Sequence, residues 1–257
     1  MKKEPLVTIV TPSYNQVSYL DETIQSVLNQ EYRNVEYIIV DGASTDGSID
    51  LIKRYDNRIS KWISEGDRGQ TDAINKGFSL ARGEIIGWLN SDDTLLPRAV
   101  SEAVQFLIEN PTVGLVYGEA NYINGYSKVI GKFPAAQTTL KKLRRGYVHI
   151  PQQASFFRKS LWDQVGPLDP SYYFAMDYDL WVRLAFVSEI KYLPRLWANF
   201  RLHADAKTIS ADDRCWPEML RVHYRNGGSW FSQIVLKYYL RKIVAPFVNY
   251  RRRKLFK

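Results

Sequence analysis

Hydrophobic residues in the first 110 positions alternate between short apolar runs and segments with helical spacing. The run at residues 35–40 is rich in β-branched residues, and all of the apolar runs are typical of buried strands. They lie at residues 6–11, 35–40, 62–64 and 84–89. Segments with helical spacing lie between them, at residues 18–30, 49–55 and 70–82. Strands that alternate with helices predict an α/β fold, with a mostly parallel sheet flanked by helices on both faces.

The second half of the chain alternates less regularly, which predicts a smaller, mixed sheet. Strands are expected at residues 113–123, 127–133, 154–158, 190–193 and 197–202, and a helix at residues 178–187. At the start of the first helix, Ser18 and Asp21 resemble a capping box.

Three of the predicted strands end in polar or acidic tips. The first is followed by Pro12-Ser13-Tyr14-Asn15, the second by the Asp41 loop, and the fourth by Asn90-Ser91-Asp92-Asp93. Ligands of parallel sheets bind at the carboxyl ends of the strands. The three tips therefore predict a single binding site at one edge of the sheet.

The tip at residues 90–93 is the most informative of the three. Adjacent carboxylates repel each other, and burying them without a partner is costly. Mg²⁺ or Mn²⁺ holding a diphosphate would balance the charge, because both ions prefer hard oxygen ligands. The alternative is an acidic turn that caps the helix after Pro97.

Composition narrows the class of protein. The chain of 257 residues has no apolar run long enough for a membrane-spanning helix. Its one cysteine, Cys215, excludes an intramolecular disulfide and fits a reducing cytoplasm. No Ser-His-Asp order, zinc-ligand spacing or Gly-Lys-Ser phosphate loop is present, and no GxGxxG follows the first strand.

The net charge of +8 is concentrated at the C-terminus, where residues 219–257 contain ten Lys or Arg and no acid. Aromatic and aliphatic residues from Trp230 to Tyr239 have helical spacing beside these cations. Such a helix suits peripheral contact with an anionic membrane, on its inner face for a cytoplasmic protein. The alternative is a packed terminal helix with a solvated basic end. The body of the chain is not basic, so nucleic acid is not an expected partner.

Four segments together resemble family 2 glycosyltransferases of the GT-A, Rossmann-like fold, over residues 5–205. They are Val10 to Asn15, Val40 to Ser48, Asn90 to Asp93, and Met176 to Trp181. The resemblance implies inverting transfer of a sugar, from a nucleotide-diphosphate sugar to a hydroxyl of a glycan or lipid-linked acceptor, in surface polysaccharide biosynthesis. We expect a catalytic domain at residues 1–210 and a basic amphipathic helical extension at residues 211–257.

The resemblance also assigns nucleotide-sugar contacts. They are Pro12, Tyr14, Asn15, Asp41, Arg68, Lys76, Asn90, Ser91 and Asp92. Asp41 would bind the base, with an Asx turn or helix cap as the alternative. Tyr14 either stacks on the base or packs within its loop, and Asp46 is expected to form a turn.

Asn90-Ser91-Asp92 stands where the family carries Asp-x-Asp, so the tip has one negative charge fewer. The resemblance makes Asp92 the main ligand of Mg²⁺ or Mn²⁺. Asp93 would brace the loop or assist. His203 either closes the metal or diphosphate site or is structural.

The resemblance places the catalytic base at Asp177, with Met176 replacing the usual Glu. Asp179 is the alternative base, and only one of the two can face the donor, because they point in different directions on a helix. Asp177 could instead cap the helix. Gln153 is a candidate for the acceptor pocket. A nucleotidyltransferase and a non-catalytic sugar-nucleotide binder are the alternative functions.

Overall fold

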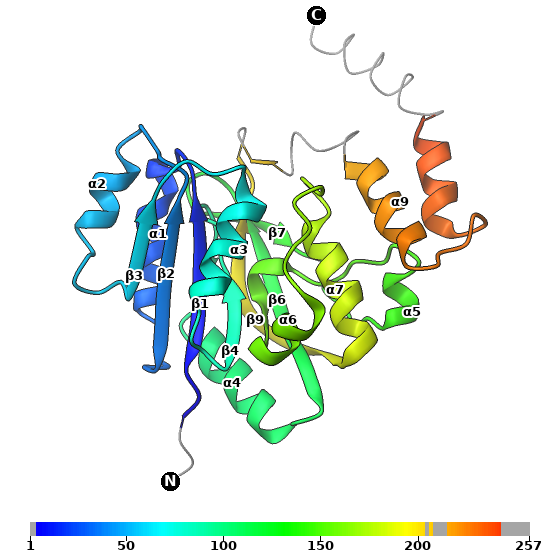
Figure 1. The fold of residues 1–257 in the computed structure, drawn as a ribbon, viewed down its shortest axis with the longest axis horizontal. Coiled ribbons are helices and arrows are strands. Elements are labelled where there is room, and N and C mark those ends of the chain that lie inside the picture. The colour runs from blue at the N-terminus through cyan, green and yellow to red at the C-terminus, as the bar shows by residue number, and fades with distance from the viewer. Residues whose placement is uncertain (1–3, 204–205, 208–214, 243–257) are drawn as a thin grey trace, which may run out of the picture.

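The computed structural model describes residues 4–203, 206–207 and 215–242. Within this part of the chain, nine strands form one mixed sheet (Figure 1). Their order is β3 (Lys61–Ser64), β2 (Val35–Asp41), β1 (Val7–Ser13), β4 (Ile85–Trp88), β8 (Ser155–Arg158), β6 (Val113–Ile123), β9 (Glu189–Arg201) and β5 (Thr94–Leu95), with β7 (Val129–Lys132) paired to β6. The first four strands along the chain are parallel, as predicted.

Helices cover both faces of the sheet and define two hydrophobic clusters. One cluster includes side chains of α1 (Val17–Leu28), α2 (Ser48–Lys53) and α4 (Ala99–Glu109). The other includes side chains of α3 (Gln70–Leu80), α5 (Leu140–Leu143), α6 (Lys159–Val165), α7 (Met176–Val187) and α9 (Cys215–Arg225). A further helix is described over residues 233–242. None of the described helices combines the length and apolar composition that crossing a bilayer requires.

The second half of the sheet is mixed, also as predicted. β8 is antiparallel to β4 and β6, whereas β6 and β9 are parallel. β9 is a single strand where the sequence predicts two. The register between β6 and β9 shifts around Pro194, which explains how the strand tolerates a residue without an N–H donor.

The predicted capping box at Ser18 is wrong. α1 begins at Val17, and its N-cap residue, Gln16, makes no side-chain cap. Instead, the Val17 N–H donates to Asp46 Oδ2 at 2.9 Å, so a loop 29 residues away satisfies the start of the helix. The acidic tip does not cap α4 either, because the N-cap of that helix is Arg98, without a side-chain cap.

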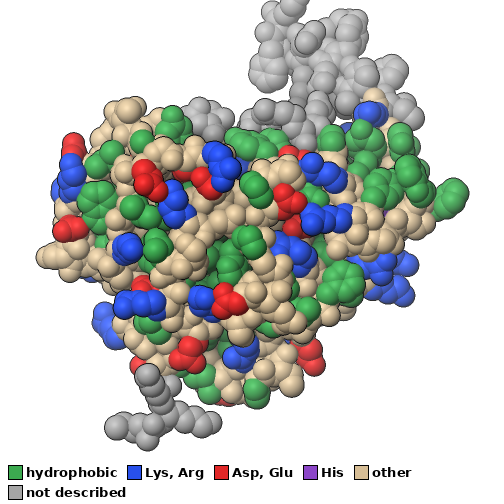
Figure 2. Space-filling model, viewed as in Figure 1, with side chains coloured by type: hydrophobic (Ala, Val, Ile, Leu, Met, Phe, Trp, Pro, Cys, Tyr) green, Lys and Arg blue, Asp and Glu red, His purple; other side chains and the backbone are tan. Residues whose placement is uncertain are grey.

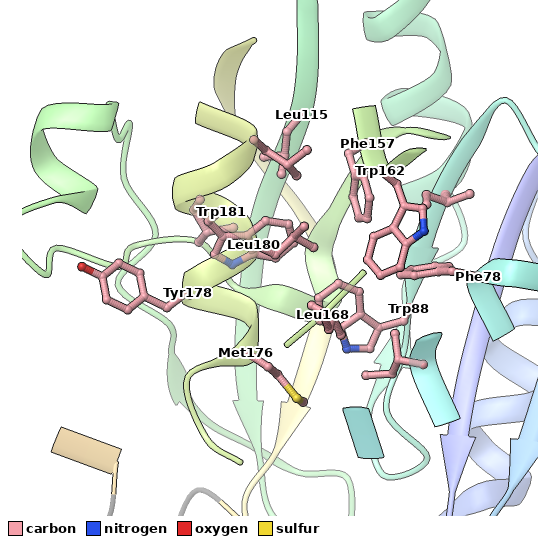
Figure 3. Packing of buried hydrophobic residues seen from close by; sticks show 14 of the residues in the cluster. Phe78, Trp88, Leu115, Phe157, Trp162, Leu168, Met176, Tyr178, Leu180 and Trp181 are labelled. Atoms are coloured by element: carbon pink, nitrogen blue, oxygen red, sulfur yellow. The ribbon is translucent and has the colours of Figure 1, made fainter. Parts of the chain in front are cut away.

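Two stacked indoles connect β4 to α7 through the core (Figure 3). The Trp88 and Trp181 rings lie 5.6 Å apart with an interplanar angle of 17°, and both side chains are buried. Phe78 contacts Trp88 edge-on at 5.9 Å. The stack fixes the end of β4, where the acidic tip begins, relative to the helix that begins with Met176 and Asp177.

We predict that Trp181→Ala lowers the free energy of unfolding by about 3–5 kcal/mol, because it opens a cavity beside Trp88. Trp181→Phe keeps an aromatic ring there and should retain most of that stability. Urea unfolding of the two variants measures the difference. Equal stability of Trp181→Ala and wild type would show that the stack is not a main support of the core.

Candidate active site

The three predicted strand tips meet at one edge of the sheet. Ser13 at the end of β1 is the register partner of Asp41 at the end of β2, and Val10 pairs with Trp88 two residues before the acidic tip. Asn15 links the first two loops, because its N–H donates to Ser44 Oγ at 2.8 Å.

Asp41 is fully buried at this edge, and both of its carboxylate oxygens accept hydrogen bonds. The Ser44 N–H and hydroxyl donate to it at 2.9 and 2.5 Å, and the Ser64 hydroxyl donates at 2.7 Å. These contacts order the loop around the carboxylate. Asp46 forms the expected turn, since its Oδ1 accepts the Ser48 N–H at 3.0 Å.

Gly42 is buried in this loop, between Tyr14 and Asp67. A Cβ atom on Gly42 would lie 2.8 Å from Asp67 Oδ2 and 3.3 Å from Tyr14 Cδ2. Tyr14 is 63% exposed, so one face of its ring is accessible. Sequence reasoning missed Asp67, although its position after the third strand of the parallel half could have identified it.

The acidic tip divides its two carboxylates between different environments. Asp93 is buried, and its Oδ1 accepts the Arg201 N–H at 2.8 Å. Burial, followed by the charge of Asp92, raises the pKa of Asp93 well above its usual range. Asp92 is half-buried, and its Oδ2 lies 3.0 Å from His203 Nε2. The two predicted metal ligands, Asp92 and His203, are therefore adjacent.

Arg201 is a fully buried cation that holds the acidic tip in place. Its Nε donates to the Asp92 carbonyl at 2.7 Å, and its Nη1 to the Asn124 carbonyl and Ser127 hydroxyl at 3.2 and 2.8 Å. It also pairs with Glu22 on α1. Sequence reasoning missed Arg201, because its partners lie far away in the chain.

Asn90 uses both ends of its amide. Its Oδ1 accepts from Gln70 Nε2 at 2.7 Å, and its Nδ2 donates to Gln152 Oε1 at 3.3 Å and Asp93 Oδ2 at 3.4 Å. Gln152 in turn donates to the Trp88 carbonyl at 2.6 Å. An ionised Asp at position 90 would lack the N–H donors and add a like charge beside Asp93, which gives a physical reason for the Asn.

Lys207 lies between Gln70, which donates to Asn90 of the acidic tip, and Tyr173, which precedes α7. Its Nζ donates to Gln70 Oε1 at 2.9 Å and lies 4.0 Å from the centre of the Tyr173 ring. Burial lowers the pKa of Lys207 to about 8, against the opposing charges of Asp177 and Glu218. Burial raises the pKa of Asp177, and the charge of Lys207 opposes that rise. The charges of Asp177 and Lys207 therefore shift each other's pKa.

The acids at the start of α7 have different partners. Asp177 Oδ1 accepts the Tyr178 N–H at 2.7 Å, so it also satisfies a donor in the first turn of the helix, whose N-cap residue, Ala175, makes no side-chain cap. Glu218 on α9 accepts the N–H groups of residues 173–175 at 2.6–3.0 Å, so it satisfies the donors that precede the helix. Asp179 is buried and pairs with Arg183 at 2.8 Å, and Arg183 donates to carbonyls of residues 165–167. Asp179 thus stabilises a neighbouring loop, which favours Asp177 as the side chain available for chemistry.

The remaining predicted residues lie around this centre. Arg68 pairs with Asp72 at 3.2 Å and Lys76 with Glu65 at 2.6 Å, so local carboxylates hold both cations. Three further candidates from the sequence, Pro12, Ser91 and Gln153, are buried. Within the described residues, Gln153 Nε2 has no hydrogen-bond partner.

The side chains at the tip fit a metal ion that is bound jointly by the protein and its substrate, rather than one bound by the protein alone. Among the residues that the structure describes, no group of three or more His, Cys, Asp or Glu could hold an ion. Asp92 and His203 supply two donors, so a cation there would need oxygens from a substrate and water. Mg²⁺ is commonly bound in this way, by one or two carboxylates together with phosphates.

Comparison with known families identifies the class of this protein. The model of glycosyl transferase family 2 matches residues 8–165, which is more than half of the chain. The chain therefore belongs to glycosyl transferase family 2.

Individual relatives agree with that assignment. An uncharacterized glycosyltransferase of Mycobacterium tuberculosis is 33% identical over 192 residues, covering 74% of this chain and 72% of the relative. Hyaluronan synthase of Pasteurella multocida is 28% identical over 212 residues, covering 81% of this chain but 22% of that protein. The mannosyltransferase PcManGT of Pyrobaculum calidifontis, solved with GDP-Man and Mn²⁺, is 19% identical with a TM-score of 0.69, covering 93% of this chain and 71% of that one. The last likeness confirms the GT-A fold.

We predict that Arg201→Met destabilises the acidic tip, because the Asp92 carbonyl loses the donor that the structure gives it, while the Asn124 carbonyl keeps only the Ser127 N–H. Each buried group left unsatisfied costs about 1–3 kcal/mol. Thermal unfolding should show a lower midpoint than for Arg98→Met, which removes an exposed arginine. Equal midpoints for the two variants would contradict the structural role of Arg201.

Proposed function

We propose that this protein transfers a sugar from a nucleotide-diphosphate sugar to a hydroxyl of a glycan or lipid-linked acceptor, with inversion, in surface polysaccharide biosynthesis. One observation carries the proposal: hydrogen bonds from Asn90 through Gln70 to Lys207 connect the acidic tip to the neighbourhood of Asp177. Hyaluronan synthase, one of the relatives, supports the polysaccharide class.

The nucleotide would bind over the loops that follow β1, β2 and β3. Tyr14 offers an exposed ring for stacking, and Asp67 offers an acceptor for donor groups of the base or ribose. Asp41 is fully buried, so it would reach the base only after giving up a contact with Ser44 or Ser64. Pro12, Asn15, Ser91 and Asn90 would shape this pocket. Arg68 and Lys76 would reach the diphosphate only after leaving their carboxylate partners.

The diphosphate would lie at the acidic tip, where Asp92 with His203 would hold Mg²⁺ or Mn²⁺. The bound cation would compensate the charge that develops on the leaving diphosphate. Arg201 and Asn90 fix the loop that presents Asp92, and Asp93 braces it from the interior. Lys207 adds a positive charge on the side facing α7.

Asp177 would act as the general base. It would accept the proton of the acceptor hydroxyl while that oxygen attacks the anomeric carbon, from the side opposite the leaving diphosphate. General-base assistance typically contributes about 10²- to 10⁴-fold to the rate. Gln153 is buried, and the preceding residue, Gln152, accepts a hydrogen bond from Asn90. Gln153 stays a candidate for positioning the acceptor.

The proposal is tested by the binding and hydrolysis of UDP-, GDP- and dTDP-sugars, with and without Mn²⁺. We expect one donor class to bind with Mn²⁺, and Asp92→Ala to weaken that binding at least about tenfold, because the tip loses its available carboxylate. Asp50→Ala, an exposed acid on α2, is the matched control and should bind normally.

The other outcomes of this panel each answer a specific alternative. Absence of binding by every sugar nucleotide would overturn the proposal. Binding without turnover, even with acceptor glycans, would identify a sugar-nucleotide binder instead. Consumption of a nucleoside triphosphate with release of pyrophosphate would identify a nucleotidyltransferase.

Activity should depend on pH through Asp177. Because burial raises the pKa of Asp177 above its ordinary value of 3.8, the rate should fall as the pH drops through that raised pKa and the base becomes protonated. Lys207→Met removes an opposing charge, so it should shift this acid limb to higher pH. Profiles of kcat/KM against pH measure the shift, with Lys53→Met as the control. An unmoved limb in Lys207→Met would contradict the coupling.

The division into a catalytic domain at residues 1–210 and a basic extension at residues 211–257 is also a proposal. Within the extension, Leu220 on α9 packs with Ile234 and Val235 of the last described helix. The basic run Arg251 to Lys254, expected to contact a membrane, lies outside the described residues.

A further inference from the structure

A cavity of about 760 Å³ opens beside the C-terminal helices, away from the three strand tips. It lies between α5, α9 and the turn that precedes residues 233–242, and Lys141, Arg144 and Arg145 line it together with Phe231. None of the lining residues is acidic. We call these four residues, with Trp230, Leu236 and Leu240, the C-terminal basic face.

The sequence segments that form this face also lack acidic residues. No Asp or Glu occurs in residues 120–162, which contain α5, or in residues 219–257. Arg144 is half-buried, and its Nη2 donates to the Gly227 carbonyl at 2.7 Å. Lys141 and Arg145 are exposed. The face is therefore suited to an anion that accepts several hydrogen bonds.

Large apolar side chains stand beside these cations. Phe231 is fully exposed and Trp230 is 70% exposed, while Leu236 and Leu240 lie on the outer side of the helix. The inner side, Ile234 and Val235, packs against α9. In Figure 2, hydrophobic side chains gather over these C-terminal helices, with Lys and Arg side chains next to them. Solvent-exposed apolar residues at this density mark an interaction surface.

We propose that the C-terminal basic face docks on an anionic bilayer, with Phe231, Trp230, Leu236 and Leu240 in the interface and lipid phosphates beside Lys141, Arg144 and Arg145. Cations bordering exposed aromatic and aliphatic side chains are the combination that binds anionic lipid surfaces. A nucleic acid would leave Leu236 and Leu240 without apolar contacts.

The same face is connected to the helix that carries the proposed base. The Tyr178 hydroxyl, one residue after Asp177, donates to the Leu143 carbonyl of α5 at 2.6 Å. Glu218 of α9 binds the segment before α7. Docking would therefore bring the bilayer against α5 and α9, the two helices that contact α7, where Asp177 lies, and the segment before it. This consequence, unlike docking itself, rests on the proposed function, and it favours an acceptor anchored in lipid.

Vesicle sedimentation of the full chain tests the docking without any assay of activity. We expect vesicles of equal parts phosphatidylcholine and phosphatidylglycerol to bind the protein, and pure phosphatidylcholine to bind it at least about tenfold more weakly. Lys141→Ser with Arg145→Ser, and separately Phe231→Ser with Leu236→Ser, should each weaken binding to the mixed vesicles about tenfold or more. Arg54→Ser with Arg58→Ser removes two exposed arginines elsewhere and should bind like wild type.

Three results would overturn the proposal. One is the absence of binding to either kind of vesicle. In another, both double variants still bind the vesicles, whereas replacing Arg251, Arg252 and Arg253 by Ser abolishes binding. The third is self-association of the wild type that Phe231→Ser abolishes in the absence of lipid binding. Circular dichroism of the variants excludes unfolding as the cause, and donor binding, measured separately, tests the proposed function independently.

Discussion

The stack of Trp88 on Trp181 is the contact on which the geometry of the site depends. It joins the last residue of β4 to the second turn of α7, two elements that are 88 residues apart in the sequence at their closest ends. Both indole N–H groups are buried without a hydrogen-bond partner in the described structure, an arrangement that costs free energy. Burial of two large rings in contact offsets that cost. The acidic tip and Asp177 are thus held at a fixed separation by the core.

Charge balance at the tip is the second constraint. Asp92 and Asp93 are adjacent, and the protein separates them by burying Asp93 against the backbone of Arg201 and leaving Asp92 beside His203. Asn90 then serves as a neutral connector between Gln70 and Gln152. The loss of one carboxylate relative to the family's Asp-x-Asp pattern therefore preserves the shape of the loop while reducing its negative charge. Lys207 further reduces the negative charge of the region, which weakens its attraction for a cation, so a metal ion there would depend on the negative charge of a bound diphosphate.

Local patterns were sufficient to predict the alternation of strands and helices and the convergence of the three tips. Each of these depends on residues close together in the sequence and on the general geometry of parallel sheets. The capping box at Ser18 failed because Asp46, in a different loop, satisfies the start of α1. Arg201, Glu218 and Lys207 could not be predicted, because their roles come from partners 44 to 137 residues away. The proximity of Asp92 and His203 agrees with the sequence-based pairing, and their metal binding remains a prediction.

The most direct test of the central claim is the anomeric configuration of the sugar that the enzyme first releases when it hydrolyses its donor, followed by NMR. A single displacement assisted by Asp177 predicts the anomer opposite to that of the donor. It also predicts that Asp177→Asn stops release while donor binding persists. Release with retained configuration, or release that Asp177→Asn leaves unchanged, would contradict the account.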